Sequence, residues 1–170
     1  MKYTSAEAAK LLKKLNEQYT ALLSKETRSR QFFAALGEDI ESVRPEYNFK
    51  ETQQQLEEIK RQIRIVKHAI NVFNCTHKVP GFDMTVDEML VYIPQLTSDK
   101  NRLYMMKEAM PKVRTHVSGA GKSNVVIDYM YANYDIKEAE DEYHRVSELL
   151  AKAQLALDTL NNTENMEIEF

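Results

Sequence analysis

This chain contains few of the residues that interrupt helices or form cross-links. The 170 residues include one cysteine, four glycines, four prolines and no tryptophan. Because Cys75 is alone, an intramolecular disulfide is excluded. The chain also lacks a charged-then-apolar leader and any run of about 18 apolar residues. We therefore expect a cytoplasmic protein that does not enter a membrane.

Neither sign of charge dominates the chain. Lys and Arg number 23 against 26 Asp and Glu, which gives a formal net charge of −3. This balance provides no global attraction for nucleic acid, whose binding depends on neutralising phosphates. The length suits one domain with its own core, since domains commonly hold about 100–200 residues. We predict a single helical domain over residues 1–170.

The sequence does contain two apolar ladders with alternating steps of three and four residues. This spacing predicts long helices with an apolar seam. One ladder lies in a helix predicted over about 49–73, and the other lies in a final helix that follows Asp135. The ladder members that we select as candidate interaction seams are Leu56, Ile59, Ile63, Val66, Ile70, Tyr143, Val146, Leu150 and Leu157.

Two further helices are predicted by their start signals. Thr4 and Thr85 are each followed three residues later by Glu, which is the capping-box pattern. The first of these helices should run from Thr4 to near Gly37, because Phe32, Phe33 and Leu36 resume its apolar face. It should fold back on the second helix as an antiparallel hairpin. The helix that starts after Thr85 should kink or restart at Pro94, which lacks the amide for a helical hydrogen bond.

Short β-structure is predicted in two places. Residues 112–131 contain β-branched and aromatic runs around a glycine-containing loop, which favours a hairpin. Residues 166–170 alternate between apolar and acidic, and we expect this strand to join the hairpin because a lone hairpin is marginally stable. The predicted fold class is mainly α: a long antiparallel helical hairpin within a four-helix bundle, with a small antiparallel β-sheet.

The segment 119–123, Gly-Ala-Gly-Lys-Ser, is similar to the end of a phosphate-binding loop. That loop also requires a glycine five positions before Gly121, where this chain has His116. The residues that follow favour a strand and not the helix whose N-terminus binds phosphate. We interpret the segment as a hairpin loop.

Cys75 and His77 are the most suggestive pair of metal ligands. A structural zinc site generally needs four ligands, and a catalytic site would need His116 or His144 to converge on the pair. A small cysteine and a surface histidine are the simpler interpretation, so we expect no cofactor. A metal-dependent enzyme around Cys75 and His77 stays open as an alternative.

The second predicted helix carries a basic face away from its ladder, formed by Lys60, Arg61, Arg64 and Lys67. Such a face can bind nucleic-acid phosphates. Glu57 and Glu58 lie about one turn before these cations, however, and favour ordinary pairing within the helix. Nucleic-acid binding is therefore a possible function that we do not favour.

Tyr129 and Tyr131 lie two residues apart in a predicted strand. Alternation places them on one face. They can stack on a nucleobase or cap the end of the helix bundle, and we favour the cap.

Two segments of the chain carry short motifs in a particular order. NVFNCTHKVPGFDMTVDEML has an Asn/Thr turn before a Thr-opened helix, and QLALDTLNNTENMEIEF closes a long helix with an Asn-rich turn. From Ile70 onward this order resembles a group of uncharacterised bacterial helical proteins labelled septicolysin-like. The resemblance implies a helical fold and a bacterial origin. It brings no catalytic residue to this chain, and we expect no lytic activity because a membrane-spanning segment is lacking.

Together these patterns predict a non-enzymatic helical interaction or assembly protein of the bacterial cytoplasm. Long helices expose seams that few neighbours cover, so we expect self-association into a homo-oligomer through those seams. The expected partner is a second copy or another protein.

Overall fold

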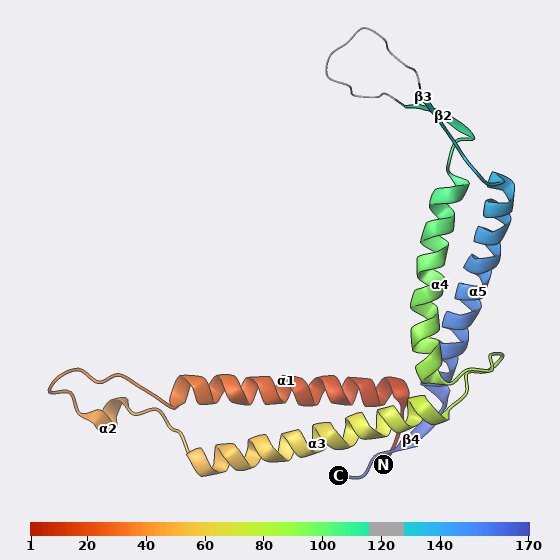
Figure 1. Ribbon diagram of the computed structural model, residues 1–170. Helices are drawn as coiled ribbons and strands as arrows, with labels where there is room; N and C mark the ends of the chain where they lie inside the picture. The colour runs from red at the N-terminus through yellow and green to blue at the C-terminus, as the bar shows by residue number, and fades with distance from the viewer. Residues whose placement is uncertain (116–127) are drawn as a thin grey trace, which may run out of the picture. The chain divides into compact units, whose positions relative to one another are not determined.

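The computed structural model describes residues 1–115 and 128–170 (Figure 1). The described chain is mainly α-helical with small antiparallel sheets, which confirms the predicted fold class. Over these two ranges, no helix has the length and apolar character needed to span a membrane. The elements are β1 (Lys2–Thr4), α1 (Ser5–Ser29), α2 (Ile40–Val43), α3 (Phe49–Thr76), α4 (Val86–Lys107), β2 (Lys112–Thr115), β3 (Asp128–Tyr131), α5 (Ile136–Thr163) and β4 (Asn165–Glu167).

Contacts divide the chain into two compact units. Unit 1 holds residues 1–78 and 158–170, and unit 2 holds residues 79–157, so α5 contributes to both. Each unit has its own helical pair and its own two-stranded sheet. The single domain expected over 1–170 stays a prediction.

Unit 1 is built on an antiparallel pair formed by α1 and α3 (Figure 1). The α3 ladder supplies buried Leu56, Val66 and Phe73, and α1 supplies buried Ala8 and Leu15. The predicted helical hairpin is therefore confirmed. Its apolar seam forms much of the core of this unit, because burial of such side chains drives helix packing.

Capping boxes start α1 and α4, as predicted. The Thr4 hydroxyl accepts from the Glu7 amide at 3.2 Å, and the Glu7 carboxylate accepts from the Thr4 amide at 2.9 Å. The same exchange joins Thr85 and Glu88 at 3.3 and 2.7 Å. Each box satisfies amides that the first helical turn leaves without partners.

The first helix is shorter than predicted. It ends at Ser29, and the Arg30 amide closes it on the Glu26 carbonyl at 2.8 Å. Of the apolar residues that extended the predicted helix toward Gly37, Phe33 and Leu36 do not pack, since they are 98% and 107% exposed. Without a surface to cover them, these side chains supply no burial energy to continue the helix.

The C-terminal strand pairs differently from the prediction. Antiparallel β4 pairs with β1, in the register Lys2 with Glu167 and Tyr3 with Met166. It does not join the hairpin strands β2 and β3, which form a separate two-stranded sheet. In its observed place β4 buries Met166 and the following Ile168 within unit 1, to 7% and 1% exposure. Burial of these two side chains explains the choice of partner.

Unit 2 contains α4 beside the α5 residues that precede 158. The ring centroids of Tyr104 on α4 and Tyr143 on α5 lie 6.0 Å apart. Helix α4 runs through Pro94 without the predicted restart. Pro94 has no amide to bond the Leu90 carbonyl, so the helix continues with one internal hydrogen bond fewer at this point.

Leu56→Ala tests the burial of the α3 ladder. Leu56 is 3% exposed, so its truncation should lower the free energy of unfolding by about 2–5 kcal/mol. The matched control is Leu36→Ala at 107% exposure, which should change stability by no more than about 0.5 kcal/mol. Urea unfolding followed by circular dichroism measures both. Equal losses in the two variants would contradict the assignment of the core.

Candidate functional site

A groove of about 640 Å³ lies wholly within unit 1. One wall is the C-terminal half of α3, and the other is the segment 165–169, which contains β4. We call this feature the α3–β4 groove. Its helix wall is largely apolar, with contributions from Ile65, Ala69, Val72 and Phe73.

The helix wall ends in a stacked ring pair. The Phe73 and His77 rings lie 4.0 Å apart with an interplanar angle of 19°. The His77 Nδ1 lies 3.1 Å from the Phe73 carbonyl oxygen, which orients the imidazole at the helix end. Val72 on the apolar wall is 48% exposed, and the polar residues Thr76 and His77 follow it at the end of the helix. The groove thus has an accessible apolar wall that ends at a polar rim.

The strand wall presents backbone groups as well as side chains. Met1 and Ile168 exchange both backbone hydrogen bonds, at 2.9 and 3.0 Å. Hydrogen-bonded and non-hydrogen-bonded pairs alternate along an antiparallel ladder. Glu167, opposite Lys2, is therefore in a non-hydrogen-bonded pair. Its N–H and C=O point away from β1, and among residues 1–115 and 128–170 no further strand pairs with this edge.

The side chains along this edge are acidic. Glu167 and Glu169 line the groove and are exposed, whereas the intervening Ile168 is buried. On the helix wall, Arg64 also lines the groove, and its guanidinium contacts the Glu57 carboxylate at 3.3 Å. The strand side of the groove therefore favours positively charged groups.

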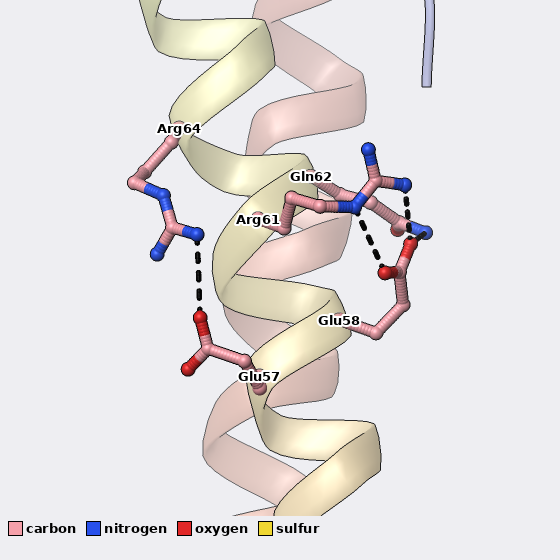
Figure 2. Close-up of polar contacts among 5 residues, drawn as sticks. All are labelled: Glu57, Glu58, Arg61, Gln62 and Arg64. Carbon is pink, nitrogen blue, oxygen red and sulfur yellow. Dashed lines mark hydrogen bonds and ion pairs between the residues drawn. The ribbon is translucent and has the colours of Figure 1, made fainter.

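The basic face of α3 is compensated by acids (Figure 2). Arg61 contacts Glu58 at 2.8 Å, and Glu57 contacts both Arg64 at 3.3 Å and Lys60 at 3.9 Å. Three of the four predicted cations thus have a carboxylate partner on their own helix. This arrangement matches the intrahelical pairing that the sequence favoured.

Glu58 shows how strong this local pairing is. Two hydrogen bonds from Arg61, at 2.9 and 2.8 Å, and one from Gln62 at 2.9 Å reach its carboxylate. These contacts hold the pKa of Glu58 at about 2, below the ordinary 4.5. Arg61 is thereby engaged by Glu58 and is less available to an external phosphate.

The candidate metal ligands do not form a cluster in the described part of the chain. Cys75 is exposed, and His77 contacts Thr76 and the Phe73 carbonyl. No three His, Cys, Asp or Glu side chains within residues 1–115 and 128–170 are arranged to hold a metal ion. The Gly-Lys-Ser segment and His116 lie outside the described residues.

The candidate interaction seams lie mainly inside the chain. Leu56, Val66, Val146, Leu150 and Leu157 are buried, at 0–7% exposure. The remaining seam residues are partly exposed: Ile59, Ile63, Ile70 and Tyr143. The buried members stabilise the two units, and self-association through the seams stays a prediction.

Sequence reasoning missed the α3–β4 groove. The signal on α3 was a second apolar stripe beside the ladder, with Ile65, Ala69 and Val72 at steps of four and three. The alternation in residues 166–170 identified the strand. Its partner β1 is only three residues long, which is too short to show a period-two pattern.

Arg61→Met tests the cause of the low pKa of Glu58. Loss of the guanidinium should move this pKa upward toward 4.5, while the Gln62 hydrogen bond persists. The low pKa stabilises the fold above pH 4.5, and this contribution is lost as the pH falls toward 2. Because exposed pairs add little to stability, the urea midpoint of the variant should lie slightly below that of the wild type at pH 6 and close to it at pH 2.

Titration of ¹³C-labelled glutamate by NMR measures this pKa directly. Arg64→Met, which removes one of the two cationic partners of Glu57, is the matched control and should leave the Glu58 titration unchanged. A Glu58 midpoint near 4.5 in the wild type would contradict the pairing.

Comparison with known proteins identifies the fold alone. No family model and no curated protein sequence matches the chain. The chain is similar in structure to "a functionally unknown conserved protein from Corynebacterium diphtheriae", with a TM-score of 0.61 and 14% sequence identity. The match covers 98% of this chain and 100% of the other. At this identity the similarity supports a shared fold and leaves the function to be argued from the site.

Proposed function

We propose that this chain is a non-enzymatic interaction protein of the cytoplasm that binds an extended segment of a partner protein in the α3–β4 groove. The observation that carries the proposal is the open backbone edge at Glu167, which faces away from β1. An unpaired strand edge is a template for an added strand, and an adjacent apolar wall gives side-chain specificity. The groove has both features within one unit.

The groove favours a particular kind of segment. Main-chain hydrogen bonds to the β4 edge would hold the partner in an extended form. Alternate side chains of that strand would meet the apolar wall at Val72, which is accessible. Lys or Arg opposite Glu167 or Glu169 would add about 0.2–1 kcal/mol for each cross-strand pair. The expected ligand is therefore a segment with alternating apolar and basic residues.

The same charges argue against β4 as a self-pairing strand. Two copies joined through this edge would bring the acids of one chain against those of the other. Like charges that face each other across a strand pair are destabilising. Self-association, if it uses the partly exposed seam residues such as Ile59 and Ile63, is independent of the groove. Size-exclusion chromatography with light scattering reports it separately.

A capped peptide of alternating Lys and Val is the probe for the groove. In NMR spectra of the full chain it should shift the amides of residues 165–169 and of α3 near Val72. A Glu-Val peptide of the same length should leave them in place, because its acids would meet Glu167 and Glu169. Equal shifts with both peptides, or none with either, would refute the proposal.

Two variants make this test specific. Val72→Glu places a charge on the apolar wall and should abolish binding, whereas Val91→Glu, at a similarly exposed valine of α4, should bind as the wild type does. The pair Glu167→Lys and Glu169→Lys should reverse the preference toward the Glu-Val peptide. An unreversed preference would show that the acids do not select the ligand.

A further inference from the structure

The exposed ribbon of unit 2 has a chemically distinctive face. Antiparallel β2 and β3 place Lys112 opposite Tyr131 and Arg114 opposite Tyr129. Directly opposed residues, and residues two apart in one strand, share a face. The four side chains therefore lie together, and we call this surface the Lys-Tyr face. Val113, Asp128 and Met130 belong to the opposite face.

The tyrosines of this face are open to solvent and close to each other. Tyr129 is 45% exposed and Tyr131 is 61% exposed, with ring centroids 6.5 Å apart. The Lys112 Nζ lies 4.0 Å from the Tyr129 centroid and 5.2 Å from that of Tyr131. An exposed contact between a cation and a ring stabilises less than a stacked nucleobase does, so a base can displace the ammonium group.

Charge distinguishes this face from the basic face of α3. Within the described residues, none of the observed ion pairs involves Lys112 or Arg114. The acid of the ribbon, Asp128, belongs to the other face. Two cations thus lie beside two exposed rings without a carboxylate of the described ribbon on the same face. Proteins that bind single-stranded nucleic acid combine positive charge with exposed aromatic rings in this way.

We infer that the Lys-Tyr face binds single-stranded nucleic acid, with bases stacked on Tyr129 and Tyr131 and phosphates contacted by Lys112 and Arg114. Residues two apart in a strand are separated by about 6.8 Å, so both cations can contact one backbone. In a duplex the base faces are already stacked, which leaves only the two phosphate contacts. The site is separate from the α3–β4 groove and does not depend on the function proposed for it.

The test uses the full chain and a fluorescein-labelled twelve-nucleotide oligothymidylate. Anisotropy reports binding, and quenching of intrinsic tyrosine emission reports stacking, because the chain has no tryptophan. Two phosphate contacts at about −0.7 each predict a slope of log affinity against log salt of about −1.4 between about 50 and about 200 mM salt. Binding without a salt dependence would overturn the phosphate contacts.

Variants separate stacking from charge. Tyr129→Ala with Tyr131→Ala should weaken binding by about tenfold or more, whereas Phe at both positions should retain it, because the rings persist. Lys112→Ala with Arg114→Ala should weaken binding and bring the salt slope near zero. Met130→Ala on the opposite face and Lys60→Ala with Arg64→Ala on α3 should bind as the wild type does. All of these side chains except Lys60 are exposed, and circular dichroism verifies that each variant is folded.

Three outcomes would overturn the inference. The first is no binding at about 50 mM salt, where phosphate contacts are strong. The second is equal affinity for the oligothymidylate annealed to its complement, which would exclude stacking on free bases. The third is equal competition by poly-glutamate, which would show that the face recognises polyanions or acidic peptides without using their bases.

Discussion

The pairing of β1 with β4 is the interaction on which the proposed site depends. It joins residues 2–4 to residues 165–167, and so it holds the two ends of unit 1 together. This pairing buries the Met166 and Ile168 side chains on one face of the strand, and it leaves the Glu167 N–H and C=O pointing away from β1 along the strand edge. Closing so long a loop costs conformational entropy, and the two buried side chains help to offset that cost. The same strand that completes the core therefore also builds one wall of the groove.

The pairing of charges differs among the exposed surfaces. On α3, the cations lie within reach of acids on the same helix, and the pairing is strong enough to hold the pKa of Glu58 at about 2. Exposed pairs of this kind add little to stability, but they neutralise a face that would otherwise attract phosphates. On β4 the acids face a groove, and on the ribbon the cations flank exposed rings. Uncompensated charge is thus placed next to accessible apolar or aromatic surface, where it can select a ligand.

Local signals were sufficient to predict several elements of the fold. The capping residues Thr4 and Thr85 and the ladder through Leu56 and Val66 identified helix starts and the paired faces, because these depend on neighbours within a few residues. The end of α1 and the partner of β4 could not be predicted in the same way. Phe33 and Leu36 extend the apolar pattern, yet their exposure shows that no surface covers them. The choice between β1 and the hairpin depends on which side chains become buried, and the spacing of residues in the sequence does not contain that information.

Hydrogen exchange at β4 tests the central claim most directly, since the groove has a function only if its strand edge is open. The Met166 and Ile168 amides face β1 and should exchange slowly, whereas the Glu167 amide faces away and should exchange close to the rate of an unstructured peptide. Slow exchange at Ile168 with fast exchange at Glu167 is the predicted result. Equal protection of the Glu167 and Ile168 amides would show that the edge is already occupied and would contradict the account.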